Sequence, residues 1–221
     1  GRAPAPNVIL SLDDSGSMRG TNGGITQYQA LRNALTETFS ENNPDVADGK
    51  IRLAWQMFNG CRGFPSYSDG CNNKNVMRSL EGGDYDLNKH RGRFLRWART
   101  IPANGWTPTH GTMQRAGEYL SKPFSDKENP WRTKPGDPST PSKEDYLPCR
   151  RSYHILMTDG GWNKQYYYTL SIGRYANASH NFPDGTAYNP SSNPELRVYK
   201  HGNSHPRGTP GDYSDSFIGD L

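Results

Sequence analysis

The chain has 221 residues, of which only 32 are Leu, Ile, Val or Phe, a fraction below the roughly one fifth that marks a risk of disorder. Its 13 Tyr, its 5 Trp and a net charge of only +4 exclude a fully disordered chain, which would combine few aromatics with strong charge repulsion. No segment approaches the roughly 18 consecutive apolar residues of a membrane span, so we expect a small packed core with long polar loops.

Residues 8–12 and 28–39 predict the first strand and the first helix. The first range is an apolar run broken by one serine and bounded by a proline and two aspartates, as in a strand buried on both faces. In the second range, apolar side chains recur at helical spacing until the Asn-Asn-Pro sequence at 42–44 stops the pattern.

Further segments complete the predicted order of elements. Alternation at 51–57 predicts a strand, 75–80 is a weaker candidate for an edge strand, 87–101 and 107–120 have helical spacing, and 152–158 predicts a further buried strand. This order is typical of an α/β fold with an open, mostly parallel, Rossmann-like sheet and helices on both faces.

Residues 121–148 and 164–221 resist assignment to strands or helices. Both are rich in Pro, Gly, Ser and charged or amide residues, and loops this long in a compact domain are usually insertions or functional segments. We therefore expect one domain over 1–221, with a core at about 7–163 and two long insertions.

Cys61 and Cys71 flank a polar, glycine-rich stretch that would need its ends tied together. A disulfide between them would stabilise the fold by roughly 3 kcal/mol and would persist outside the cytosol. The alternative is two unrelated buried thiols, because pairing cannot be read from sequence alone. Cys149 is then the odd one out, either buried or paired with a cysteine outside this sequence.

Asp13, Ser15 and Ser17 follow the first predicted strand at a spacing of two. Open α/β sheets place ligands at the carboxyl ends of strands, and alternate residues of a tight turn can point the same way. One carboxylate and two hydroxyls suit a small hard cation such as Mg²⁺ or Mn²⁺. Taken alone, the motif is more typical of an ordinary strand-to-helix turn.

Two later segments favour the metal site over the turn. Thr107 opens the predicted helix at 107–120, and Asp159 ends the strand at 152–158. In a sheet of strand order 3-2-1-4, the fourth strand would bring Asp159 to the same edge as Asp13 and next to the Thr107 loop. We expect one divalent cation at this edge, held by Asp13, Ser15, Ser17, Thr107 and Asp159.

The three segments together resemble the metal-ion-dependent adhesion site (MIDAS) of von Willebrand factor type A (vWA) domains over residues 7 to about 163. The shared features are Asp-x-Ser-x-Ser, Gly-x-Thr-x-Thr and a hydrophobic strand that ends in Thr-Asp-Gly. The resemblance implies that a carboxylate of a partner protein completes the coordination, which gives adhesion without catalysis.

The resemblance also implies a role for each side chain near the cation. The hydroxyl groups of Ser15, Ser17 and Thr107 would bind the cation directly, either always or in only one state of the site. Carboxylates would act mainly through bound waters: Asp13 and Asp159. Asp14 and Thr109 would support these ligands without contacting the cation, or would have no role in binding it.

A closer resemblance extends over nearly the whole chain. Cys-Arg at 149–150, Thr-Asp-Gly-Gly-Trp-Asn at 158–163, Phe-Pro-Asp-Gly-Thr at 182–186 and Tyr-Ser-Asp-Ser at 213–216 resemble the amino-terminal vWA domain of the PilC/PilY family of type IV pilus tip adhesins and biogenesis factors. It implies export through the periplasm to the cell surface or pilus tip, contact with minor pilins or host-surface proteins, and roles in pilus biogenesis, attachment and surface sensing. It also implies that the last strands of the sheet would follow residue 221.

Other functions are weighed against this one. A vWA module of another extracellular assembly would hold the same ion for a different partner. A phosphoryl-transfer enzyme of the haloacid-dehalogenase type could use Asp13 as its nucleophile, but it would need a second aspartate where Ser15 stands. A Gly-x-Ser-x-Gly elbow and a phosphate-binding P-loop are missing, so we expect no enzymatic activity.

The basic run at 89–99 could contact nucleic acid or an anionic surface. The solvated face of an amphipathic helix is the simpler interpretation, and we expect no nucleic-acid partner.

Overall fold

The computed structural model describes residues 3–59, 76–107, 109–120, 122–126, 128–133, 147, 150–160, 180–181 and 187–188. Its elements in chain order are β1 (Asn7–Leu12), η1 (Gly16–Arg19), β2 (Thr21–Asn22), β3 (Ile25–Thr26), α1 (Gln27–Thr38), η2 (Pro44–Val46), β4 (Arg52–Met57), β5 (Arg78–Ser79), α2 (His90–Ala98), α3 (Thr109–Leu120), β6 (Ser152–Met157), β7 (His180–Asn181) and β8 (Ala187–Tyr188).

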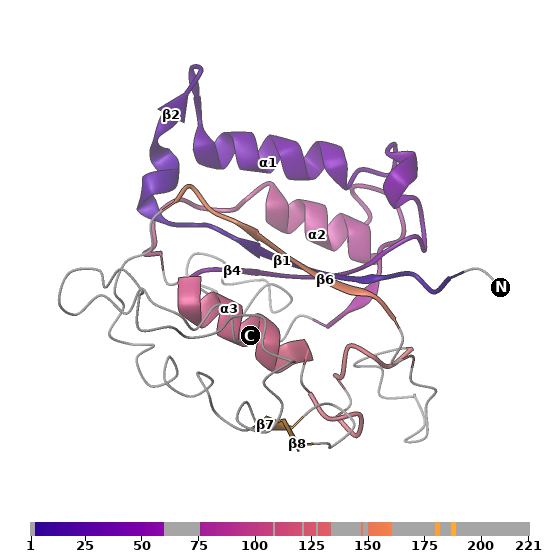
Figure 1. Cartoon of the computed structure of the whole chain (residues 1–221). Coiled ribbons are helices and arrows are strands. Elements are labelled where there is room, and N and C mark those ends of the chain that lie inside the picture. Colours follow the sequence, from indigo (N-terminus) through magenta and orange to yellow (C-terminus); the bar gives the residue numbers. More distant parts are fainter. Residues whose placement is uncertain are drawn as a thin grey trace.

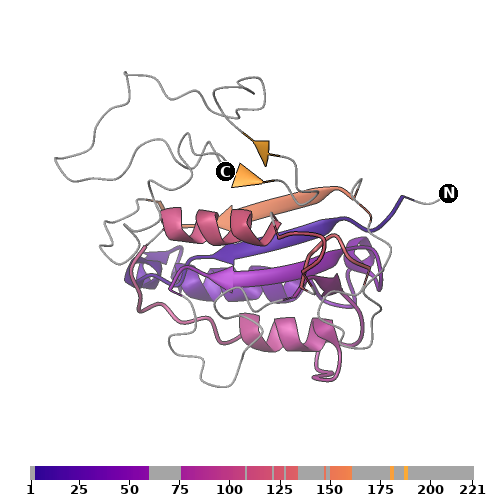
Figure 2. The same cartoon turned by 90° about the horizontal axis from the view of Figure 1, so that it is seen from below.

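Four strands form the main sheet in the order β5-β4-β1-β6. Two pairings place β1 parallel to both β4 and β6, while the short β5 runs antiparallel to β4 at one edge. Figure 1 shows α1 and α2 on one face of the sheet and α3 on the other, and Figure 2 shows α3 in front of the strands when the molecule is seen from below. The predicted α/β class and the strand order 3-2-1-4 are confirmed.

Both faces of β1 and β4 are buried because helices cover both sides of the sheet. Alternate residues of a strand point to opposite faces, so Leu10 and Trp55 pack with α1 and α2, while Ile9 and Ala54 pack with α3. The α1–α2 side holds the larger hydrophobic cluster, which includes Phe94. The alternation at 51–57 thus predicts the strand correctly, although its small and polar residues are buried as well.

The α3 face of the sheet contains a buried polar network. Gln56 donates from Nε2 to Ser11 Oγ at 2.8 Å and to the Thr112 carbonyl at 2.9 Å. Arg115 donates from Nε to Gln56 Oε1 at 2.9 Å, and His154 Nε2 lies 2.7 Å from Ser11 Oγ. These hydrogen bonds offset the cost of burying polar groups and attach α3 to the strands.

The helix α1 begins and ends close to the predicted positions. The Thr26 side chain accepts a hydrogen bond from the Gln29 backbone N–H and so caps the first turn. Before it, the β2–β3 hairpin turns through Gly23 and Gly24, whose φ angles of 61° and 83° lie in the left-handed region that glycine tolerates. This hairpin was not predicted.

The predicted helix at 87–101 is shorter in the structure. Asp86 Oδ1 accepts a hydrogen bond from the Asn88 backbone N–H at 3.0 Å, and this turn delays the helix start to His90. Leu87 lies before α2 and is 44% exposed, whereas Ile101 is buried beyond its end. The helical spacing of these two residues was therefore coincidental.

The prediction that 152–158 is a buried strand is wrong in part. β6 forms as predicted, but Tyr153 is 48% and Ile155 is 43% exposed. β6 is the edge strand of the four-stranded sheet, and its exposed residues alternate with half-buried ones. Among the described residues, no helix covers this side of β6 as the helices cover β1 and β4.

His90 is buried at the start of α2, where its Nε2 lies 2.7 Å from the Leu53 carbonyl and its ring packs on Trp55 at 4.9 Å. Burial lowers the pKa of His90 from 6.5 to about 4. The unfolded chain takes up the proton below about pH 6.5, whereas the folded chain does so only near pH 4.

The stabilisation from neutral His90 is therefore complete above about pH 6.5 and is lost as the pH falls from there through 4. We expect the free energy of unfolding to fall by up to about 3 kcal/mol over this window. Urea unfolding of the wild type and of His90→Gln, which keeps an N–H donor, measures the difference. If the free energy of unfolding falls equally with pH in both proteins, His90 is not the group responsible.

Several predictions lie outside the described residues: the Cys61–Cys71 disulfide, the position of Cys149, and most of the insertions at 121–148 and 164–221. Within the described part of the chain, no helix has the length and apolar character to cross a membrane.

Candidate functional site

The candidate site begins where β1 ends. Asp13 continues directly from the strand, and its backbone N–H donates to the Met157 carbonyl at 3.0 Å, which ties this turn to the end of β6. The 3₁₀ helix η1 follows at Gly16. The carboxyl ends of β1 and β6 thus lie side by side, because the two strands are parallel and in register.

The Asp13 carboxylate is fully buried and held from both sides. Its Oδ1 accepts the Ser15 backbone N–H at 2.8 Å. Its Oδ2 accepts the Thr158 hydroxyl at 2.8 Å and lies 3.4 Å from the Asp159 backbone nitrogen, which also donates to it. These bonds fix the orientation of the carboxylate before any ligand arrives.

Two serine hydroxyls connect this turn to Asp159. Ser15 Oγ and Ser17 Oγ lie 2.8 Å apart, and Ser17 Oγ donates to Asp159 Oδ1 at 3.1 Å. Ser15 is buried, whereas Ser17 and Asp159 are exposed. The structure therefore brings four of the predicted ligands together, with one side of the group open to solvent.

The loop that carries Thr107 lies against the same turn. Gly105 and Ser15 form a parallel β-bridge, and the Gly16 backbone N–H donates to the Gly105 carbonyl at 2.9 Å. Thr107 is buried two residues further along. Its carbonyl accepts the Thr109 backbone N–H at 2.9 Å, just where α3 begins.

Asp14 contacts Asn59 and the loop that carries Thr107. Its carbonyl accepts the backbone N–H groups of Asn104 and Gly105, both at 3.0 Å. Its Oδ1 accepts the Asn59 side-chain amide at 2.6 Å and the Asn59 backbone N–H at 3.1 Å. Burial raises the pKa of Asp14 to about 6, against the effect of these hydrogen bonds.

Asn59 was missed by the sequence analysis. Besides contacting Asp14, its side chain donates to the Trp106 carbonyl at 2.7 Å and accepts the Trp106 backbone N–H at 3.0 Å. It stands two residues after β4, a parallel neighbour of β1. The rule that polar residues gather at the carboxyl ends of parallel strands could have identified it.

The spacing of the two serine hydroxyls is compatible with a small hard cation as well as with the hydrogen bond between them. Adjacent ligands of an octahedral Mg²⁺ with bonds of about 2.05 Å lie about 2.9 Å apart, close to the 2.8 Å between the two serine hydroxyls. Among the described residues, no group of three or more His, Cys, Asp or Glu side chains could hold a metal ion. Any cation here would therefore rely on hydroxyls as well as carboxylates.

The other predicted residues have less direct contact with this group. The Thr109 hydroxyl is buried and has no hydrogen-bond partner among the described residues. Trp162 and Asn163, which carry much of the family resemblance, lie outside the described part of the chain.

The chain is related in sequence to type IV pilus biogenesis factors. It is 36% identical over 141 residues to PilY1 of Pseudomonas aeruginosa strain PAO1, a match that covers 62% of this chain and 11% of that protein. It is 36% identical over 138 residues to PilY1 of strain PAK, covering 62% and 10%, and 33% identical over 141 residues to PilY1 of strain UCBPP-PA14, covering 63% and 10%.

The chain thus spans about a tenth of the length of these relatives. No protein-family model and no solved structure matches it. The chain is therefore similar in sequence to a short part of PilY1. Membership of the vWA class is a proposal that rests on the three motifs and the strand order.

Proposed function

We propose that this chain is a vWA-type, cation-dependent protein-binding module of a PilY1-related type IV pilus protein. One Mg²⁺ or Mn²⁺, held at the MIDAS by the candidate site, would bind a carboxylate of a partner protein. The observation that carries this proposal is the hydrogen-bonded group formed by Asp13, Ser15, Ser17 and Asp159 at the carboxyl ends of β1 and β6.

The geometry favours binding over nucleophilic catalysis. Both Asp13 oxygens accept hydrogen bonds, from the Ser15 N–H and from the Thr158 hydroxyl, which hold the carboxylate in place. Ser15 stands where a phosphatase of the haloacid-dehalogenase type would need a second aspartate. The serine hydroxyls add no formal charge. A cation with few protein charges around it stays attractive to an incoming anion, and the exposed side at Ser17 and Asp159 leaves room for one.

The biological setting of the proposal comes from the relatives, which are named as type IV pilus biogenesis factors. We infer that this chain is exported to the cell surface, at the pilus tip, and that it acts in pilus biogenesis, surface attachment and sensing. Its partners would be minor pilins or host-surface proteins that offer an exposed Asp or Glu.

Calorimetric titration with Mg²⁺ and Mn²⁺ tests the cation site. The variant is Ser17→Ala, which removes an exposed hydroxyl and leaves the buried Asp13 contacts intact. We expect saturable binding of one cation by the wild type and at least tenfold weaker binding by Ser17→Ala, because a ligand is lost.

The matched control is Ser79→Ala, which removes a serine on the edge strand β5, away from the candidate site. It is expected to bind cations like the wild type. Equal affinity of Ser17→Ala and Ser79→Ala, or no saturable binding by the wild type, would contradict the proposal.

A further inference from the structure

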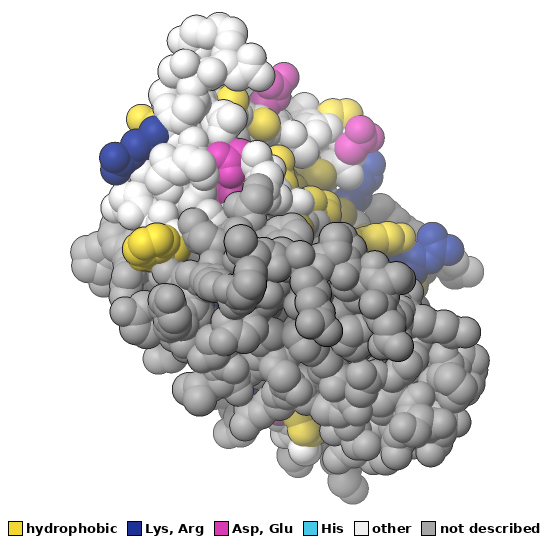
Figure 3. All heavy atoms as spheres, turned by 60° about the vertical axis from the view of Figure 1, so that its left-hand side comes forward, with side chains coloured by type: hydrophobic (Ala, Val, Ile, Leu, Met, Phe, Trp, Pro, Cys, Tyr) yellow, Lys and Arg dark blue, Asp and Glu magenta, His cyan; other side chains and the backbone are white. Residues whose placement is uncertain are grey.

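An apolar groove of about 440 Å³ lies between α1, the β2–β3 hairpin and the end of β6. Its apolar lining is Met18, Ile25, Ala30, Leu31, Ala34 and Met157. Figure 3 shows exposed hydrophobic side chains next to acidic ones on this side of the molecule. The groove has the size of a small-ligand or side-chain pocket, which is typically about 300–1,000 Å³.

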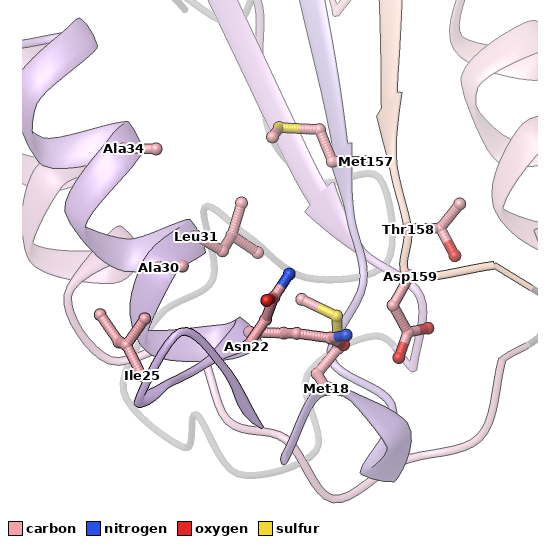
Figure 4. Close-up of a pocket in the computed structure, with 10 residues that line it drawn as sticks. Met18, Asn22, Ile25, Ala30, Leu31, Ala34, Met157, Thr158 and Asp159 are labelled. Atoms are coloured by element: carbon pink, nitrogen blue, oxygen red, sulfur yellow. The ribbon is translucent and has the colours of Figure 1, made fainter. Parts of the chain in front are cut away.

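The groove reaches the candidate cation site. Thr158 and Asp159 line its end, and these residues also contact Asp13 and Ser17. Figure 4 shows Asp159 on one side of the groove and Ile25, with the α1 side chains, on the other. A ligand whose carboxylate lies at the cation site would therefore have its neighbouring atoms at the mouth of the groove.

Gln27 adds a polar contact to this apolar lining. Its side-chain Oε1 is buried and has no hydrogen-bond partner among the described residues. A buried acceptor without a donor costs free energy, and a ligand N–H could recover it once the Gln27 side chain turns this oxygen toward the groove. A peptide backbone supplies such an N–H, whereas a hydrocarbon chain does not.

We propose, resting on the proposed function, that the groove receives a large aliphatic side chain next to the acidic residue of the protein ligand. Gln27 accepts a backbone N–H of the same segment. The ligand class is then an extended peptide in which Asp or Glu stands beside Leu, Ile or Met. The cation binds the carboxylate of the Asp or Glu, and the groove binds the adjacent aliphatic side chain.

The test uses three blocked peptides and the whole chain in Mg²⁺, with fluorescence anisotropy as the readout. The peptides have the sequences Gly-Leu-Glu-Leu-Gly, Gly-Ser-Glu-Ser-Gly and Gly-Leu-Gln-Leu-Gly. We expect the first to bind at least about tenfold more tightly than the second, because burying a leucine side chain is strongly favourable. The third, and the first without Mg²⁺, should bind much more weakly.

Variants of α1 test whether the groove causes the preference. Ala30→Gln and Ala34→Gln place longer side chains at exposed helix positions that line the groove, and glutamine is a good helix former. Both should reduce the preference for leucine over serine. Thr38→Gln, at an exposed α1 position that does not line the groove, should preserve it.

The outcomes separate this inference from the proposed function. Equal, Mg²⁺-dependent binding of the leucine and serine peptides would contradict the proposed role of the groove. The proposed cation site would still stand. Equal binding of the Glu and Gln peptides, with or without Mg²⁺, would overturn the coupling of groove and cation. If sedimentation shows a dimer that Ala34→Gln abolishes, a second copy of this chain occupies the groove. That result would also contradict the proposal.

Discussion

Replacing Arg91 with methionine is expected to lower the free energy of unfolding by about 3–5 kcal/mol. The guanidinium of Arg91 is fully buried and donates to the carbonyls of Phe39, Val46 and Gly82 at 2.7–2.8 Å. These carbonyls belong to the end of α1, to η2 and to the loop before α2. Methionine fills a similar volume but leaves three acceptors without their donors.

Two further substitutions at this contact sharpen the test. Arg91→Lys should fall between the wild type and Arg91→Met, because one ammonium cannot reproduce the planar set of donors. Asp48→Asn should change stability by less than about 1 kcal/mol, because Asp48 is 64% exposed although it lies 3.1 Å from Arg91. Urea unfolding measures all three, and a loss below about 1 kcal/mol in Arg91→Met would contradict this account.

Gly105→Ala is expected to destabilise the fold by about 2–4 kcal/mol. A Cβ at this position would lie 2.1 Å from Nδ2 and 2.3 Å from Cγ of Asn59. Asn59 would have to move, and Asp14 Oδ1 and the Trp106 backbone would lose their hydrogen bonds to its amide. The same movement would displace the loop that carries Thr107.

Gly16→Ala is the matched control for this substitution. Its Cβ would meet only the Gly105 carbonyl oxygen, at an ordinary distance of 3.8 Å. We expect near wild-type stability and Mn²⁺ affinity for Gly16→Ala, and losses of both for Gly105→Ala. If the two variants have equal stability, Asn59 does not organise the site as the hydrogen bonds indicate.

Local sequence patterns were sufficient to predict the sheet. The apolar run at 8–12 and the alternation at 51–57 identify β1 and β4, and the Asn-Asn-Pro sequence at 42–44 predicts the end of the first helix. These features depend on residues close together in the sequence. The strand order then follows from the usual connections of α/β folds.

The errors concern properties that depend on distant residues. The exposure of Tyr153 and Ile155 depends on what lies beside β6, which the strand's own sequence does not reveal. The hydrogen bonds from Gln56 to Ser11 and Thr112 likewise join three separate elements. No local periodicity reports such contacts.

Local sequence likewise predicts one part of the candidate site and does not predict the other. The two-residue spacing of Asp13, Ser15 and Ser17 and the Thr-Asp-Gly sequence at 158–160 were visible in the sequence. The contacts of Asn59 with Asp14 and Trp106 were not, because Asn59 stands alone after its strand. The groove could not be predicted either, since its lining comes from η1, β2, β3, α1 and β6 and from the turn after β6.

The most direct test of a cation at this site is an anomalous-difference map from crystals grown with Mn²⁺. We expect one strong peak at about 2.1–2.2 Å from the hydroxyl oxygens of Ser15 and Ser17, with Asp13 and Asp159 close by. A saturating Mn²⁺ concentration that gives no peak there, or a peak only elsewhere on the chain, would contradict it.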